Sequence, residues 1–420
     1  MNNTALIVLL TLASVAGYKI MVLAPVPMRS MNILGVGYVR HLLNAGHEVT
    51  YVSVFPLREK SENLTQVDLS NMNLDIFEGT AYLYMKTSCT YAALVKIIIK
   101  IDDDAGNISY FITQPPSEGT NVEYMANSAK VAEATFQNKE MQALLHDPTF
   151  KFDVIICDYM ESEMYAAYFF TGLTGPREKY FYENFFAPLF LKKNKALPNY
   201  YELMYNASLV LANDFPGNGL IPSTPQNFKF IGGYHIESAT KPLSTSKYRI
   251  VLFLFDEMKP HEAFLILLNK VYNLLFYIPV LFPAHPKCLF FISHGGLLST
   301  TESAHFGVPT IGIPIYFDQF INVQRGVQSG RTIRVDLTLN LVNDLRVAIQ
   351  KMIQDPSYKQ RAKEVSQMYH DRPVSPGAEL VHWVEHVVRT RDAPHLRSPA
   401  LMLPWYQKMF LDVILKSKQP

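Results

Sequence analysis

The stretch Phe290-Phe-Ile-Ser-His-Gly-Gly-Leu-Leu-Ser-Thr-Thr-Glu302 decides the fold class of this chain. Its apolar start leads into two glycines, and residues that suit a helix follow them. A buried strand that passes through a glycine turn into a helix is the repeating step of a parallel α/β sheet. The pattern therefore predicts a strand over Cys288–Ser293 and a helix over Leu298–Phe306.

The same turn has the chemistry of a phosphate site. Gly295 and Gly296 let a ligand approach the backbone closely, and the free N–H groups and the dipole of the following helix favour an anion. Ser299 and Thr300 add hydroxyls in the first helical turn, and His294 adds an imidazole. Taken alone, the glycines are equally well explained by tight packing of the strand against the helix.

The residues beyond the turn favour a nucleotide sugar. Glu302 lies one helical turn further along, where its carboxylate is placed to accept hydrogen bonds from ribose hydroxyls. Thr310–Ile313 predicts the next strand, which leads to Asp318 and Gln319. Ligands of open α/β sheets bind at the carboxyl ends of the strands, so these two side chains are suited to the hydroxyls of a hexose.

The run FISHGGLLSTTESAHFGVPTIGIPIYFDQFINVQRGVQSG resembles the signature of the UDP-glycosyltransferases, in particular the arthropod members. Tyr38–Pro56, Phe228–Glu237 and Ala393–Val413 also resemble that family, so the similarity covers most of the chain. The resemblance implies an α/β fold of two facing Rossmann-like domains, the GT-B type. The N-terminal domain is then expected to take the acceptor, and the C-terminal domain the UDP-sugar.

The resemblance also implies the reaction and its donor site. The implied site consists of His294, Gly295, Gly296, Ser299, Thr300, Glu302, Asp318 and Gln319. The implied donor is UDP-glucose or a related nucleotide sugar, used as a co-substrate with no further cofactor. The acceptors are small lipophilic alcohols and phenols of the kind handled in detoxification, and transfer inverts the anomeric carbon.

One position departs from the family pattern in the catalytic machinery. In the family, a His on the first loop takes the proton of the acceptor, and an Asp at a nearby strand end holds that His. Asp158, after the predicted strand Phe152–Cys157, matches the Asp, but Met31 occupies the position of the His. General-base catalysis is typically worth about 10²–10⁴-fold in rate. We expect impaired transfer, with a non-catalytic lumenal protein that binds small lipophilic molecules as the alternative.

A second departure concerns the donor domain. Between Gly233 and His294 the chain lacks the family's small-residue loop and its Trp-x-Pro-Gln segment, so we expect an incomplete donor domain. The Pro/Ser/Thr-rich segment Lys241–Lys247 suggests the boundary between the domains. The predicted limits are a signal peptide at 1–17, an acceptor domain at 18–238, a donor domain at 239–392, and a C-terminal tail at 393–420 that packs back and lacks the family's membrane helix.

Hydrophobic patterns predict further elements along the chain. Tyr18–Ala24, a loop at Pro25–Ser30, a helix over Asn32–Asn44 and Glu48–Phe55 form a strand–helix–strand unit. The other predicted elements are a strand over Ala207–Ala212 and helices over Glu161–Phe170, Leu341–Ile353, Tyr358–His370 and Gly377–Thr390. The alternation of strands and helices agrees with two α/β sheets.

Several features point to the secretory pathway. The apolar run from Ala5 to Ala16 is too short to span a bilayer and ends in small residues, as a cleaved signal peptide does; a buried strand is the alternative. Sequons at Asn63, Asn107 and Asn206 suit a glycosylated lumenal chain. We therefore expect the endoplasmic reticulum lumen or secretion, and membrane association only if a C-terminal helix is restored.

Composition excludes several classes of protein. The 420 residues carry 38 basic and 37 acidic side chains, so the net charge of +1 gives no reason to expect binding to nucleic acid. With 49% hydrophobic residues the chain can bury large cores, and with 3 cysteines it has no disulfide framework. His285, His305 and His382 show no metal-ligand spacing with cysteines or carboxylates, so we expect no metal. Monomer and dimer both stay open.

Overall fold

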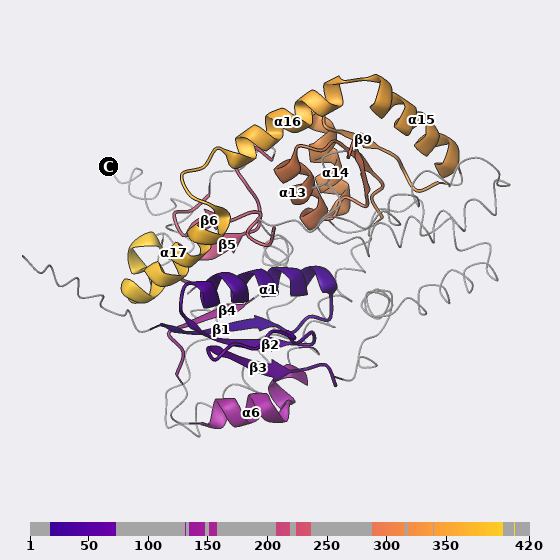
Figure 1. Cartoon of the computed structure of the whole chain (residues 1–420). Coiled ribbons are helices and arrows are strands. Elements are labelled where there is room, and N and C mark those ends of the chain that lie inside the picture. Colours follow the sequence, from indigo (N-terminus) through magenta and orange to yellow (C-terminus); the bar gives the residue numbers. More distant parts are fainter. Residues whose placement is uncertain are drawn as a thin grey trace, which may run out of the picture.

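The computed structural model describes residues 17–72, 131, 134–147, 151–157, 207–218, 224–236, 288–315, 318–338, 340–397 and 407. Within this part, strands pair in three parallel groups with the orders β3-β2-β1-β4, β5-β6 and β7-β8-β9 (Figure 1). Parallel sheets with helices between consecutive strands are the expected α/β architecture, which is therefore confirmed.

The N-terminal sheet is covered by a helix on each face, as Figure 1 shows. Its elements are β1 (Lys19–Ala24), α1 (Arg29–Asn44), β2 (Glu48–Ser53), β3 (Leu64–Asp68), α6 (Lys139–His146) and β4 (Val154–Cys157). Successive side chains of a strand point to opposite faces. In β1, Ile20 and Val22 accordingly join the core under α1, whereas Met21 packs in the core that contains Met141 of α6.

A short parallel pair follows this sheet in the chain. It consists of β5 (Val210–Ala212) and β6 (Phe228–Phe230), and β6 leads into a turn at Gly232 and Gly233. Gly233 has φ +94°, a left-handed conformation that glycine adopts without steric cost. Ile231 and Tyr234, on either side of the glycines, are buried in the core under α1, so the turn is fixed against the N-terminal sheet.

The C-terminal sheet has its own core. Its elements are β7 (Phe291–Ser293), α13 (Leu297–Phe306), β8 (Thr310–Gly312), α14 (Gln319–Gln328), β9 (Thr332–Arg334), α15 (Leu341–Gln354) and α16 (Ser357–His370). Ile311 and Ile313 pack against Leu341 and Leu345, which lie four residues apart on one face of α15. The apolar positions that predicted a helix in this segment are therefore the buried face of α15.

Helix α17 (Pro376–Arg389) returns to the N-terminal sheet. Its Leu380 and Val384 are buried in the same core as Ile20 and Val39. A helix from the predicted 239–392 range thus packs on the sheet of the predicted 18–238 range. The domain limits themselves stay predictions, and most of the predicted signal peptide and tail lie outside the described residues.

Several element bounds differ from those expected. Helix α1 begins at Arg29 rather than Asn32, because the N–H of Asn32 already donates to the carbonyl of Met28 at 3.0 Å. The predicted loop Pro25–Ser30 is correspondingly shorter. The sequence patterns did not reveal β3, α6, β6, α14, β9 or the short 3-10 helix Pro394–Leu396. Strands of three to five residues and helices of eight to ten carry too few periods for a clear pattern.

Candidate functional site

The turn between β7 and α13 forms as expected. Ser293 ends the strand, Gly295 has φ +82°, and Gly296 is the residue before the first helical turn. The hydroxyl of Ser293 accepts a hydrogen bond from the N–H of Gly295 at 3.0 Å, which closes the turn. The N-terminus of α13 therefore begins directly at the carboxyl end of a buried strand.

Both glycines are required by close contacts. A Cβ on Gly295 would overlap the side chain of Val323 from α14. A Cβ on Gly296 would overlap the imidazole of His294, so this ring lies over the start of α13. Burial lowers the pKa of His294 to about 4. A neutral imidazole there can donate one hydrogen bond but does not add a positive charge.

The hydroxyls of the first helical turn bond within the turn itself. Ser299 lies 2.7 Å from the hydroxyl of Ser293 and donates to the carbonyl of Gly296 at 2.9 Å. Thr300 donates to the same carbonyl at 3.0 Å. These two predicted site residues thus lie beside His294 and Gly296, and their hydrogen bonds stabilise the turn.

A second helix N-terminus lies beside the first. Asp318 precedes α14 and Gln319 is its first residue. Asp318 accepts a hydrogen bond from the amide of Asn322 at 2.7 Å, and the side-chain oxygen of Gln319 accepts one from the N–H of Ile315 at 2.9 Å. Strands β7 and β8 are parallel neighbours, so α13 and α14 both start at the same edge of the sheet. The predicted donor residues are therefore brought together.

Glu302 is buried in contact with a residue from the other half of the chain. Its carboxylate lies 3.9 Å from Nε2 of His235, and the side chains of Glu302 and His235 are 8% and 0% exposed. Burial raises the pKa of Glu302 to about 8. The sequence marked the segment around His235 only as family-like, and no local pattern there indicates a contact 67 residues away.

The segment around His235 is held from both sides. His41 of α1 donates from Nε2 to the carbonyl of Tyr234 at 2.8 Å. On the other side, Tyr369 of α16 donates to the carbonyl of Gly232 at 3.2 Å, and Arg372 donates to the same carbonyl at 3.3 Å. This segment therefore connects the N-terminal sheet to the helices of the C-terminal sheet.

The acceptor-side predictions are only partly placed. Met31 is half-buried in the first turn of α1, on the helix rather than in the loop where it was expected. Asp158 lies just outside the described residues, after β4. Among the sequons, Asn63 is exposed in the turn before β3, whereas Asn107 and Asn206 lie outside the described residues.

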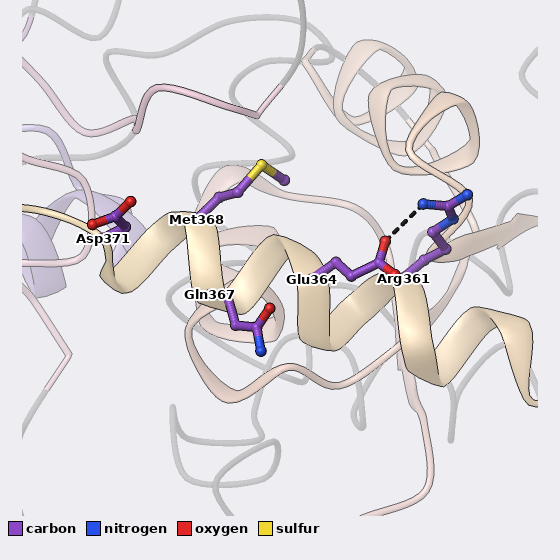
Figure 2. Close-up of a pocket in the computed structure, with 5 residues that line it drawn as sticks. All are labelled: Arg361, Glu364, Gln367, Met368 and Asp371. Atoms are coloured by element: carbon purple, nitrogen blue, oxygen red, sulfur yellow. Dashed lines mark hydrogen bonds and ion pairs between the residues drawn. The ribbon is translucent and has the colours of Figure 1, made fainter.

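A pocket elsewhere on the molecule has different chemistry. It is lined by residues of α16 and by Asp371, which follows that helix, and within it Arg361 and Glu364 form an ion pair at 2.7 Å (Figure 2). None of the predicted donor residues lines it. Across the described ranges, no helix is long and apolar enough to cross a membrane, and no group of three His, Cys, Asp or Glu could hold a metal ion.

The sequence of this chain is similar to those of known UDP-glycosyltransferases. Residues 245–416 match the family model for UDP-glucoronosyl and UDP-glucosyl transferase. UDP-glycosyltransferase UGT5 of Dactylopius coccus is 45% identical over 31% of this chain and 25% of its own length. UDP-glucosyltransferase 2 of the same species is 32% identical over 52% of this chain and 49% of its own length. Human UDP-glucuronosyltransferase 2A1 is 37% identical over 45% of this chain and 34% of its own length. The matches thus span half or less of each relative.

A solved structure shows the same architecture. CalG4, the calicheamicin glycosyltransferase, superposes with a TM-score of 0.50 and 15% identity, covering 90% of this chain and 100% of that chain. At this level of identity the likeness concerns the fold alone. It supports the expected GT-B arrangement of Rossmann-like domains.

Proposed function

Because this chain belongs to the UDP-glycosyltransferase family, we propose that it binds a UDP-sugar at the turn between β7 and α13 and transfers the hexose to a small lipophilic acceptor. The proposed sugar is glucose. The observation that carries the proposal is the meeting of two helix N-termini at one sheet edge, with His294 lying over Gly296. Backbone N–H groups and helix dipoles at such an edge favour a diphosphate.

In the proposed reaction, the site first binds the donor and then stabilises the departing UDP. The diphosphate lies against the start of α13, Glu302 accepts hydrogen bonds from the ribose, and Asp318 and Gln319 orient the hexose. The acceptor oxygen attacks the anomeric carbon, the bond from that carbon to the UDP oxygen breaks with inversion, and the acceptor's proton passes to water. Fixed dipoles at the helix N-terminus stabilise the negative charge that develops on the departing diphosphate. No cofactor takes part.

Calorimetric titration with UDP and UDP-glucose tests the donor site. We expect wild-type chain to bind both, and Glu302→Ala to lose most of the affinity because the ribose loses its acceptor. Glu364→Ala is the matched control, since Glu364 pairs with Arg361 on α16 and lies outside the donor residues. Absence of UDP-glucose binding by a folded wild-type chain would contradict the proposed function.

A non-catalytic binder of small lipophilic molecules is the second candidate, favoured by Met31. A thioether cannot take the proton that the family's His takes.

We predict that Met31→His raises the rate of phenol glucosylation, by up to about 10²–10⁴-fold. Met368→His, at an exposed position on α16, is the control for adding a histidine. An unchanged rate with Met31→His would show that this position is not the source of weak activity.

We also propose that the chain enters the secretory pathway. The exposed position of Asn63 supports a glycan there, because a transferase must reach the side chain. Expression in a eukaryotic secretory system followed by treatment with a glycosidase tests this. A mass that does not change on treatment, in wild type as in Asn63→Gln, argues against it.

A further inference from the structure

The imidazole of His235 has an environment that the proposed reaction does not yet explain. The side chain is fully buried, and neither ring nitrogen has a hydrogen-bond partner within the described part of the chain. Buried polar groups are almost always hydrogen-bonded, since an unsatisfied one costs free energy. The carboxyl of Glu302 lies 3.9 Å from Nε2. The function of His235 is therefore expected to involve Glu302.

We infer that His235 is a positioning residue that accepts the proton of Glu302 when a ribose binds, so that Glu302 meets the ribose hydroxyls as a carboxylate. The inference rests on the proposed role of Glu302. The proton leaves a carboxyl oxygen of Glu302 and ends on Nε2 of His235, so no proton is exchanged with solvent. The segment from the N-terminal half thereby completes a site whose other residues lie in the C-terminal half.

The chemistry of the carboxyl group explains why a proton acceptor is needed. A carboxylate accepts hydrogen bonds at both oxygens, whereas a protonated carboxyl has lost one of these positions to its own O–H. Hydrogen bonds to a charged acceptor are also roughly twice as strong as neutral ones. Burial raises the pKa of Glu302 to about 8, so at neutral pH the unliganded side chain is mainly protonated. Ribose binding must therefore remove a proton.

The imidazole can take that proton only in the presence of the carboxylate. Burial, and to a lesser degree His305, lowers the pKa of His235 to about 4. Ionisation of Glu302 at 3.9 Å raises the pKa of His235 back toward its ordinary value, because opposite charges attract strongly where water is excluded. The two changes favour transfer within the pair over release to solvent, increasingly so below neutral pH.

Other titratable groups lie near the pair. Among the described residues the nearby titratable groups are His305 on α13, Tyr369, His370 and Arg372 on and after α16, and His41 on α1. Burial, with His370 and Arg372, lowers the pKa of His305 to about 4, and burial raises that of Tyr369 to about 12. Neither His305 nor Tyr369 is therefore suited to take the proton near neutral pH.

Calorimetry at pH 6 in buffers of different ionisation enthalpy tests the inference, because it counts the protons released on binding. UDP-glucose is the probe, since its diphosphate does not titrate near this pH. We expect wild-type chain to release close to zero protons, and His235→Gln to release about one more per bound nucleotide. The affinity of His235→Gln for UDP-glucose should be about 10–100-fold below that of wild type at pH 6, and this difference should disappear toward pH 8.

Two further variants keep the result interpretable. His41→Gln retains a donor for the carbonyl of Tyr234 and leaves His235 in place, so it should release no more protons than wild type. His235→Asn replaces His235→Gln if the latter does not show a cooperative melting transition. A merely structural role of His235 would lower affinity equally at every pH.

The outcomes separate this inference from the proposed function. If wild type binds UDP-glucose and releases a full proton at pH 6, or if His235→Gln releases no more than wild type, the inference is wrong while the donor site stands. If wild type does not bind UDP-glucose at all, the proposed donor site is wrong and the inference falls with it.

Discussion

At the scale of single residues, the turn between β7 and α13 requires two glycines, because neither position has room for a side chain. Gly295 is the position at which α14 comes close, through Val323, and Gly296 is the position over which His294 lies. The hydroxyls of Ser293 and Ser299 then fix the turn by hydrogen bonds. The geometry of the proposed phosphate site thus depends on the absence of two Cβ atoms.

We predict that Gly295→Ala lowers the free energy of unfolding by about 2–5 kcal/mol, the sum of left-handed strain and overpacking against Val323. Gly46→Ala is the matched control. Gly46 has a similar φ of +87°, but nothing lies within 4 Å of its added Cβ, so we expect only the strain of about 1–2 kcal/mol. Urea unfolding measures both. Equal losses would show that the contact with α14 is unimportant.

The buried carboxyl of Glu302 makes a prediction about pH. Its pKa is raised in the folded chain to about 8, from 4.5, so the folded state binds more protons than the unfolded state between these values. Stability therefore falls as pH rises through this window. His235, whose pKa is lowered, opposes this only below 6.5.

From pH 6.5 to 8 we expect a loss of about 2 kcal/mol from Glu302. Glu302→Gln cannot ionise, so its free energy of unfolding should change less over the same range. Urea unfolding at several pH values of both proteins tests this. A decline in Glu302→Gln as steep as that of wild type would assign the effect to other groups.

At the scale of elements, two helices begin after an asparagine, but only one of these asparagines caps its helix. Asn138 precedes α6, and its side chain accepts hydrogen bonds from the N–H groups of Glu140 and Met141 at 2.9 and 3.1 Å. Asn340 precedes α15 but makes no such bond to the helix backbone. A favourable residue type therefore predicts a cap without showing whether the cap forms.

We predict that Asn138→Ala lowers the free energy of unfolding by about 0.5–2 kcal/mol, because two helix N–H groups lose their acceptor. Asn340→Ala should cost less than about 0.5 kcal/mol, since it loses no cap bond and only exposed side-chain hydrogen bonds to Asn343 and Asp344. Urea unfolding of the two variants gives the comparison. A larger loss for Asn340→Ala would contradict the difference between the two caps.

At the scale of the whole molecule, a small core joins the two halves of the chain. Phe215, which follows β5, is 0% exposed and packs with Ala304 of α13 and with Val365 and Tyr369 of α16. Nearby, the guanidinium of Arg331 donates to the side chain of Asn218 at 2.8 Å. Apolar packing and directional hydrogen bonds thus hold the segment after β5 against the C-terminal sheet.

We predict that Phe215→Ala lowers the free energy of unfolding by about 3–5 kcal/mol, because it leaves a cavity among residues from both halves. It should also weaken UDP-glucose binding, since the neighbouring Gly232–His235 segment would lose its support. Val374→Ala, at an exposed position, should change stability by less than about 0.5 kcal/mol. Unchanged stability of Phe215→Ala would show that this core is not required.

The long elements were predictable because their signals are local. The apolar run of β1, the apolar face of α15 and the glycines before α13 each lie within one window of sequence. The short strands β3 and β9 and the start of α1 were not, because three to six residues carry little periodicity and backbone hydrogen bonds set the ends.

The sequence by itself determined the α/β class and the strand–glycine–helix turn with its imidazole, because backbone geometry and hydrophobic periodicity act between neighbours along the chain. Only the tertiary structure decided that His235 lies against Glu302, that α17 packs on the N-terminal sheet, and that Phe215 lies between the halves. These contacts join residues far apart in sequence. They depend on which buried surfaces fit together, and no local pattern records that.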